Sequence, residues 1–346
     1  MYKTFFSSGA GYPAYIGGGA LSMLGRAAAE AAAGRKAAVV TDSGIPAEHV
    51  SRCTEELRSA GFEVFLMTLP AGERSKTLGT VSDVYGFLIE NSISRSDAVV
   101  GLGGGVVGDT AGFAAATYMR GTAFVSVPTT VISQTDSAYG GKTGVDHGDA
   151  KNMIGCFYDP RAVICDTDLL KTLPEAEITN GLGEIIKYGA IADPELLAGV
   201  SRGLPSDAAV FACAEIKRRF VEADRFDLGE RRVLNFGHTL GHGYEAASGF
   251  VLPHGQAVAY GMLAVTRLGE RIGVTEAGSY GAILSACERA GLDSAWEGGL
   301  PAALPYIRRD KKSDGSSVDA VLIERPGAPI RKKLPFSVLA DERNYR

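Results

Sequence analysis

The sequence predicts an α/β N-terminal domain with a mainly parallel, Rossmann-like sheet, followed by a mainly α-helical C-terminal domain. Between residues 36 and 130, short runs rich in β-branched side chains alternate with amphipathic segments of helix length, a pattern typical of parallel strands covered on both faces. Beyond residue 174 the apolar residues follow a helical period, and the next run typical of a strand is VDAVLIE at 318–324. We therefore predict two domains, 1–174 and 175–346.

The elements of the N-terminal domain follow one another in the order expected for such a sheet. The alanine-rich segment RAAAEAAAG predicts a helix that ends at Gly34. Strands are predicted in AAVVTDS, EVFLMTLP, DAVVGLGGG and AFVSVPTT, and helices at 49–60 and 76–91. No internal repeat interrupts this alternation.

The third predicted strand leads into GGGVVGD at 103–109, which satisfies the pattern G-x-G-x-x-G at a strand-to-helix turn. Glycines there let backbone N–H groups approach a pyrophosphate at a helix N-terminus. No acidic residue follows about twenty positions on, where the ribose is usually read, but Asp42, at the end of an earlier strand, could take that role. A nucleotide site is one interpretation, and a turn needed only for close helix–strand packing is the other.

A glycine-rich loop, DSAYGGKTGVDHGDAKN at 136–152, is predicted after the fourth strand. Asp136, Lys142, Lys151 and Asn152 give it charges and an amide group suited to phosphate or hydroxyl groups. The alternative is a solvated surface loop, and only the neighbouring motifs favour the binding interpretation.

Three of the chain's five histidines lie between positions 238 and 254. His238 and His242 share one face of a predicted helix, while His254 returns from the following segment. Glu184, in the apolar helix GLGEIIKYG, adds a carboxylate, and Glu245 is a further acidic residue nearby. A catalytic zinc site takes about three protein donors and leaves one position open, so these residues compete for its places. The alternative is that the histidine pair is a packed or solvated helix face.

Composition excludes several classes of function. The chain has 346 residues, 45% hydrophobic and 22% charged, with a formal net charge of −5, so no global basic field attracts nucleic acid. The N-terminus lacks the pattern of a secretory signal, and the longest uncharged stretches are too short and too rich in glycine for a membrane span. Five scattered cysteines without a C-x-x-C pair indicate reduced thiols and a cytoplasmic protein. Charge runs at 308–312 and 331–333 are typical of a solvated face.

Nine segments, taken in order, closely resemble the 3-dehydroquinate synthase family of sugar-phosphate cyclases. They are GGGVVGD, RGTAFVSVPTT, DSAYGGKTGVD, KNMIG, DTDLLKTLP, GLGEIIKYG, LNFGHTLGH, PHGQAVAYGM and RDKK. The likeness runs from about residue 10 to about residue 315, and the set is far more specific than any one member.

The resemblance implies a dehydroquinate synthase-like fold and a carbon–oxygen lyase of the shikimate pathway, which leads to aromatic amino acids. Members convert 3-deoxy-D-arabino-heptulosonate 7-phosphate to 3-dehydroquinate and phosphate, with bound NAD and one divalent metal, zinc or cobalt. The implied steps are transient oxidation by NAD, β-elimination of phosphate, re-reduction and intramolecular aldol closure. NAD is then a catalyst rather than a consumed substrate.

The resemblance also assigns roles to residues. Glu184, His238 and His254 match the metal ligands, whereas His242 matches a substrate-side residue. The matches to NAD contacts are Asp42, Glu73, Lys76, Gly105, Val106, Val107, Gly108, Asp109, Thr129, Thr130, Lys142, Lys151, Leu169, Leu170, Lys171 and Thr172. The matches to substrate contacts are Arg120, Asp136, Lys142, Asn152, Lys187, Lys217, Arg231, Asn235, His242 and Lys311. The catalytic set within these is Lys142, Lys187, Lys217, Arg231, Asn235 and His242.

Arg120 matches an arginine that reaches the phosphate bound by a neighbouring subunit, which implies a homodimer acting on a small sugar phosphate. The presence of Lys217, Arg231, Asn235 and Lys311 favours a substrate with a carboxylate over those of sister cyclases that make 2-epi-5-epi-valiolone or 2-deoxy-scyllo-inosose. Two further alternatives stay open. An NAD- and metal-dependent polyol dehydrogenase would release reduced cofactor, and a non-catalytic NAD- or metal-binding regulator would show no turnover.

Overall fold

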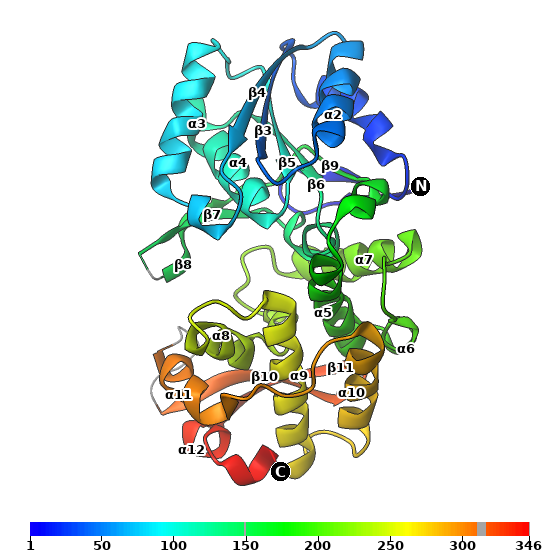
Figure 1. Ribbon diagram of the computed structural model, residues 1–346, viewed down its shortest axis with the longest axis vertical. Coiled ribbons are helices and arrows are strands. Elements are labelled where there is room, and N and C mark those ends of the chain that lie inside the picture. The colour runs from blue at the N-terminus through cyan, green and yellow to red at the C-terminus, as the bar shows by residue number, and fades with distance from the viewer. Residues whose placement is uncertain (149, 310–315, 346) are drawn as a thin grey trace. The chain divides into compact units, whose positions relative to one another are not determined.

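The computed structural model describes residues 1–148, 150–309 and 316–345 (Figure 1). They form two compact units, one of Met1–Leu173 with Ser206–Phe226, the other of Pro174–Pro205 with Asp227–Arg346. The chain thus leaves the first unit between Leu173 and Pro174, but it returns for one helix. That helix lies in a stretch which the sequence assigns to the C-terminal domain.

A seven-stranded sheet forms the centre of the first unit. Its strands are β1 (Tyr2–Phe6), β2 (Tyr12–Ile16), β3 (Lys36–Asp42), β4 (Glu63–Leu69), β5 (Ala98–Gly103), β6 (Ala123–Pro128) and β9 (Ala162–Cys165). The order is β1-β2-β9-β6-β5-β3-β4, and every neighbouring pair is parallel except β1 and β2. The four predicted strands are β3, β4, β5 and β6, so the predicted α/β class is confirmed.

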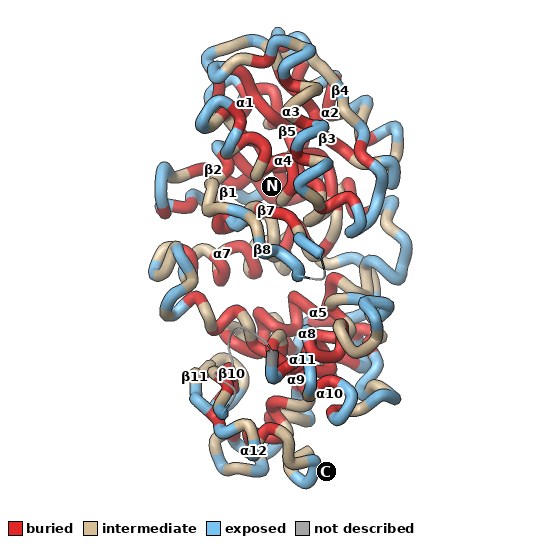
Figure 2. The backbone as a smooth tube through the Cα atoms, turned by 90° about the vertical axis from the view of Figure 1, so that its left-hand side faces the viewer, coloured by how far each residue is buried: buried red, intermediate tan, exposed pale blue. Residues whose placement is uncertain are grey.

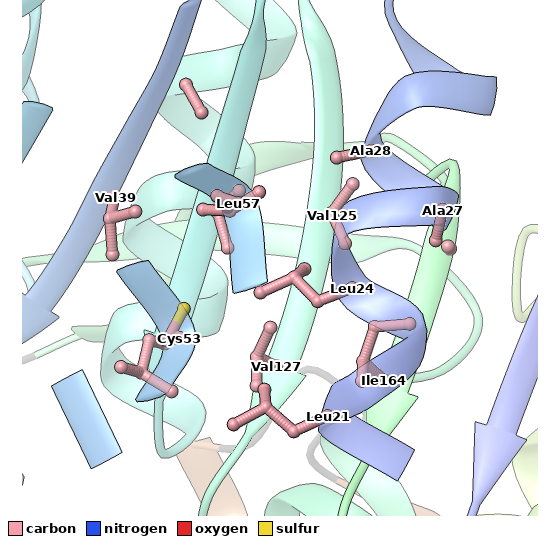
Figure 3. Close-up of a cluster of buried hydrophobic side chains, with 14 of the residues drawn as sticks. Leu21, Leu24, Ala27, Ala28, Val39, Cys53, Leu57, Val125, Val127 and Ile164 are labelled. Carbon is pink, nitrogen blue, oxygen red and sulfur yellow. The ribbon is translucent and has the colours of Figure 1, made fainter. Parts of the chain in front are cut away.

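Alternate residues of the central strands pack on opposite faces of this sheet, as the period of two along a strand requires. The covering helices are α1 (Leu24–Ala31), α2 (Ala47–Ser59), α3 (Leu78–Glu90), α4 (Gly105–Thr117) and α7 (Asp207–Ala223). Val39 and Val125 face α1 and α2, as Figure 3 shows, whereas Val99 and Phe124 face α3 and α4. Helix α1 ends before Gly34, because the backbone is already extended at Ala32.

Helix α7 covers the β1–β2–β9 end of the sheet. Phe6 and Ile16 from the strands are fully buried beside Val210, Ala214 and Val221 from the helix. The apolar period predicts a helix here, but it does not say which core the helix covers. For this reason the assignment of 206–226 to the C-terminal domain differs from the structure.

The segment predicted as a glycine-rich loop contains an antiparallel hairpin. Its strands are β7 (Lys142–His147) and β8 (Ala150–Phe157), and Gly144 pairs with Gly155. A Cβ atom on Gly144 would lie 2.5 Å from the Ile154 carbonyl oxygen, so the close approach of the two strands requires glycine. The loop prediction is wrong here, because glycines at paired positions hide the strand pattern.

The second unit is mainly helical, as predicted. Its described elements are α5 (Glu175–Ala192), α6 (Pro194–Gly199), α8 (His238–Ala247), α9 (His254–Arg271), α10 (Ser279–Ala290), α11 (Gly299–Arg309), β10 (Ser317–Arg325), β11 (Ala328–Pro335) and α12 (Phe336–Leu339). Figure 2 shows that α5 and α9 are buried along much of their length. In the charge run on β11, Arg331 forms an ion pair of 2.6 Å with Asp319. Among the described residues, no helix combines the length and apolar character needed to cross a bilayer.

Candidate metal centre and cofactor site

Three helices of the second unit bring one carboxylate and two imidazoles together. Glu184 lies in the middle of α5, while His238 and His254 are the first residues of α8 and α9. Glycine lets these helices approach closely. A Cβ atom on Gly183 would lie 2.5 Å from the Gly255 carbonyl oxygen, so any larger residue would push α5 and α9 apart.

The three donor groups converge on one point. The Oε1 atom of Glu184 lies 3.4 Å from Nε2 of His238 and 3.2 Å from Nε2 of His254. One ligand atom from each residue lies within 4.8 Å of the other two. One oxygen and two nitrogens from helices suit zinc or cobalt and leave a coordination position open.

The remaining imidazole nitrogens are held by groups that fix the ring orientations. Nδ1 of His238 donates to the Phe236 carbonyl at 3.1 Å, and Nδ1 of His254 donates to Oε1 of Glu245 at 3.3 Å. Both rings therefore present Nε2 to the common point. Such outer partners are typical of histidines that bind metals.

The electrostatics of the cluster favour a cation. Burial would raise the pKa of Glu184, but Lys187, whose Nζ lies 2.5 Å away, and the imidazole of His238 hold that pKa well below its usual range. Burial lowers the pKa of His238. For His254 burial acts in the same direction, but Glu184 and Glu245 outweigh it and raise the pKa to about 10. The two carboxylates thus favour positive charge at this point, and a divalent cation would supply that charge once His254 has given up its proton.

His242, the other histidine of the predicted helix pair, lies on the exposed side of α8. Its ring centroid is 5.5 Å from that of His238, but His242 is not in the group formed around Glu184. It belongs instead to a second group with Glu245 and His254. This arrangement fits the role of His242 beside the substrate, which stays a prediction.

The predicted cofactor residues gather in the first unit, at the carboxyl ends of the parallel strands. Asp42 ends β3, and Gly105, Val106, Val107, Gly108 and Asp109 form the beginning of α4. A pocket here is lined in part by Gly104, Asp109 and Lys142. A Cβ atom on Gly104 would lie 3.1 Å from Thr130, so the turn has little room for a side chain. Thr129 is buried, and its hydroxyl has no hydrogen-bond partner among the described residues.

Other predicted cofactor residues lie on short turns of the same unit. Glu73 begins a 3₁₀ turn (Glu73–Ser75), and its carboxylate is 4.0 Å from Lys151 on β8. The buried Lys76 lies just beyond that turn. Leu169, Leu170, Lys171 and Thr172 lie in a second 3₁₀ turn (Thr167–Thr172), where the hydroxyl of Thr172 is 2.7 Å from Nε2 of the buried His49. This part of the chain offers backbone N–H, ammonium, hydroxyl and carboxylate groups, which suit the phosphates and riboses of a dinucleotide.

The predicted substrate residues fall in both units. In the first unit, Lys217 on α7 forms an ion pair of 3.0 Å with Asp136, and Lys142 and Asn152 are exposed on the hairpin. Arg120 is exposed and has a left-handed backbone, with φ of 64°. In the second unit, the described residues are Lys187, Arg231, Asn235 and His242, with Arg231 only 2% exposed. Lys311 lies outside the described residues.

Three residues contact predicted site residues although the resemblance gave them no role. Glu245 orients His254, His49 contacts Thr172, and Asp146 accepts a hydrogen bond of 2.7 Å from the backbone of Asn152. Proximity of Glu245 to the histidines was the only sequence signal, and it indicated a competing ligand rather than a partner of Nδ1. His49 and Asp146 come next to their partners only through tertiary structure.

The chain matches two family models over adjoining segments. The first, described as 3-dehydroquinate synthase N-terminal, matches residues 66–180, and the second, 3-dehydroquinate synthase C-terminal, matches residues 181–313. The chain is also 39% identical over 340 residues to the 3-dehydroquinate synthase of Streptococcus sanguinis (strain SK36), which covers 95% of this chain and 96% of that protein.

Two solved structures are similar in fold. A 2-deoxy-scyllo-inosose synthase complexed with carbaglucose-6-phosphate, NAD+ and Co2+ has a TM-score of 0.89 at 22% identity, over 99% of both chains. A 2-epi-5-epi-valiolone synthase from Streptomyces hygroscopicus subsp. jinggangensis 5008, with NAD+ and Zn2+ bound, has a TM-score of 0.83 at 24% identity, over 95% of this chain and 94% of the other. At these identities the likeness shows the fold alone.

Proposed function

Because the chain belongs to the 3-dehydroquinate synthase family, we propose that it converts 3-deoxy-D-arabino-heptulosonate 7-phosphate to 3-dehydroquinate and phosphate. The observation that carries the proposal is the convergence of Glu184, His238 and His254 on one point, with Oε1 of Glu184 lying 3.4 Å from Nε2 of His238 and 3.2 Å from Nε2 of His254. A sugar-phosphate cyclase needs a cation at such a point to act on a substrate hydroxyl.

In this proposal Glu184, His238 and His254 hold one divalent cation, zinc or cobalt, and the first unit holds NAD. When bound, NAD supplies a reversible hydride acceptor, and the cation supplies the charge that makes a neighbouring hydroxyl more acidic. The protein provides the geometry. Lys187 balances the Glu184 carboxylate, and Glu245 keeps Nε2 of His254 directed at the cation site.

The NAD site consists of the strand ends and turns of the first unit. A Cβ atom on Gly108 would meet nothing within 4 Å, so the first turn of α4 has open space beside it, where the pyrophosphate would lie at the helix N-terminus. Asp42 is the candidate acceptor for the ribose, and the buried hydroxyl of Thr129 supplies a polar contact that the described residues do not satisfy. These features support a nucleotide over a glycine turn used only for packing.

Cationic and amide groups orient the substrate. Lys217 in the first unit and Arg231 and Asn235 in the second are the candidates for its carboxylate and hydroxyls, because ammonium, guanidinium and amide groups donate hydrogen bonds to such oxygens. The candidates for the phosphate are Lys142 and Asn152 in the first unit and His242 and Lys311 of the second, together with the partner's Arg120. The substrate phosphate itself can accept the proton that is lost during β-elimination. Catalysis then rests on orientation and charge stabilisation more than on protein acids and bases.

A phosphate-release assay tests the proposal directly. The purified protein is given the heptulosonate phosphate with a catalytic amount of NAD, before and after treatment with a chelator. We expect phosphate release that stops on chelation and resumes with zinc or cobalt, without accumulation of NADH. Steady production of NADH would instead support a polyol dehydrogenase, and binding of NAD and zinc without phosphate release would support a regulator. Release from a sugar phosphate without a carboxylate, but not from the heptulosonate, would support a sister cyclase.

We further propose that the protein is a cytoplasmic homodimer in which Arg120 acts on the partner's substrate. Arg120→Ala and His254→Ala variants should each be inactive alone. After the two are unfolded and refolded together, part of the activity should return, because one of the two sites in a mixed dimer keeps both its histidine and its partner's arginine. If no activity returns although mixed dimers form, Arg120 does not act across the interface.

A further inference from the structure

Lys76 is a buried lysine at the centre of three segments of the first unit. Its side chain is 6% exposed, and its Nζ lies 2.5 Å from Oδ2 of Asp109 in the first turns of α4. The same Nζ lies 2.5 Å from Oδ1 of Asn152 on β8. One ammonium group therefore connects the helix that follows the glycine turn with the hairpin.

The backbone around Asn152 is held by further hydrogen bonds. The Asp146 N–H donates to the Lys76 carbonyl at 2.9 Å, and the Asn152 N–H donates to Oδ1 of Asp146 at 2.7 Å. Asn152 itself has a left-handed backbone, with φ of 55°. Asparagine tolerates this conformation better than most residues, and these hydrogen bonds select it at this position. Lys76 contacts Asn152 directly through its side chain, and its carbonyl oxygen holds Asp146, which in turn holds the Asn152 N–H.

The contact with Lys76 also decides which way the Asn152 amide points. A lysine ammonium has only donors, so the amide oxygen must face it, and the amide nitrogen must face away. Nδ2 of Asn152 then carries its N–H groups on the side of the amide opposite Lys76, in a side chain that is exposed. An amide turned in this way can donate to an anion, whereas the reversed amide would present an oxygen to it.

The surroundings of Lys76 favour its charged form. Burial alone would lower the pKa of Lys76, but Asp109 and Glu73 outweigh it and raise the pKa above its ordinary value. The ammonium form is therefore the one that meets Asn152.

We propose that Lys76 is a positioning residue that turns the Asn152 amide into a donor for the phosphate of the substrate and connects it, through Asp109, to the glycine turn of the NAD site. This inference rests on the proposed function, since it assigns Asn152 to the phosphate. It adds a role for Lys76 beyond contact with NAD. It also predicts that bound NAD raises the affinity for phosphate and that bound phosphate raises the affinity for NAD, because both ligands favour the same arrangement of the hairpin.

The test is a double-mutant cycle on phosphate binding, with inorganic phosphate as the probe in calorimetry without NAD, and the KM of the heptulosonate phosphate at saturating NAD as a second readout. Lys76→Met removes the donor, and Asn152→Gly removes the amide while it tolerates the positive φ. Each single variant should weaken phosphate binding about 10-fold. The double variant should be no weaker than Asn152→Gly, because Lys76 acts on the phosphate only through that amide. If the loss of phosphate affinity in the double variant equals the product of the two single losses, the proposal is wrong.

Controls separate this role from others. Lys3→Met removes an exposed charge from the same unit and should leave phosphate binding unchanged. If Lys76→Met does not fold, Lys76→Gln keeps an uncharged amide donor group and should give an intermediate loss that again vanishes in the Asn152→Gly background. A wild-type protein that binds phosphate but releases none from the heptulosonate would contradict the proposed function alone. An active protein with an additive cycle would contradict only the role of Lys76.

Discussion

The metal centre of the second unit and the cofactor site of the first unit are built in different ways. The metal centre takes its three donors from helices, two of them at the first residue of a helix, and each donor has a partner that fixes it. The cofactor site takes its residues from strand ends, 3₁₀ turns and a hairpin, and several of them, such as Glu73 and Lys151, are exposed. Metal binding in the second unit should therefore be lost when one donor is removed. NAD binding in the first unit should weaken only a little with each contact that is removed.

The largest effect expected from this contrast follows loss of a metal ligand. His254→Ala removes one of three donors, so metal-dependent turnover should fall by more than about 100-fold, the upper end of what outer partners contribute. The fold should remain, because the histidine side chain is partly exposed. Metal content after dialysis and the rate of phosphate release measure the effect.

His147→Ala is the matched control for metal content, since His147 is an exposed histidine of the first unit. It should bind as much zinc as the wild type. A His254→Ala protein that is fully active without metal would contradict the assignment of the metal centre.

The next effect concerns stability rather than turnover. Lys187 lies 2.5 Å from the buried Glu184 carboxylate, and both side chains are at most 2% exposed. Without metal, Lys187→Met leaves that carboxylate with less compensation, so the free energy of unfolding should fall by about 3–5 kcal/mol. With zinc bound, the cation replaces the missing charge, and most of the loss should disappear.

Thermal unfolding of the chelated and zinc-loaded proteins separates the two states. Lys332→Met, an exposed substitution in the same unit, should shift neither midpoint. An equal loss for Lys187→Met with and without zinc would mean that Lys187 supports the fold and not the charge of the metal centre.

The elements of the fold differ in how far the sequence alone could predict them. The buried strands were predictable, because β3, β5 and β6 are apolar runs bounded by polar or glycine residues. The place of α7 was not, since its period reveals an apolar face but not the core that the face covers. The hairpin was missed because Gly144 and Gly155 carry no side chains to show an alternation.

For the site, spacing indicated a metal but not its ligands. His238, His242, His254 and Glu184 all compete as donors on spacing alone, and only the resemblance moves His242 from the metal to the substrate side. The structure shows why spacing fails, because His254 meets Glu184 through the approach of α5 to α9 at Gly183 and Gly255, which the sequence does not reveal. Likewise, no pattern reveals that Glu245 meets Nδ1 rather than the common point.

A smaller effect is expected from that outer partner. Glu245→Gln keeps the size of the side chain but weakens its hold on Nδ1 of His254, so the affinity for zinc should fall by about 10- to 100-fold. Competition with a chromophoric chelator measures the dissociation constant. Glu288→Gln, an exposed change on α10, is the control. Unchanged zinc affinity in Glu245→Gln would show that the helices alone orient His254.

The smallest effect should occur in the cofactor site, where many contacts share the binding energy. The hydroxyl of Thr129 is buried without a partner among the described residues, so Thr129→Val removes a polar atom that the cofactor-free protein does not satisfy. The free energy of unfolding without NAD should therefore stay the same or rise. If NAD supplies the missing partner, the affinity of the Thr129→Val variant for NAD should fall by about 2- to 10-fold. That loss corresponds to a net hydrogen-bond contribution of about 0.5–1.5 kcal/mol. Calorimetric titration with NAD and urea unfolding without NAD test both halves. A loss of stability with no change in NAD affinity would show that the hydroxyl serves the fold, and the cofactor site would then need a different polar anchor at the end of β6.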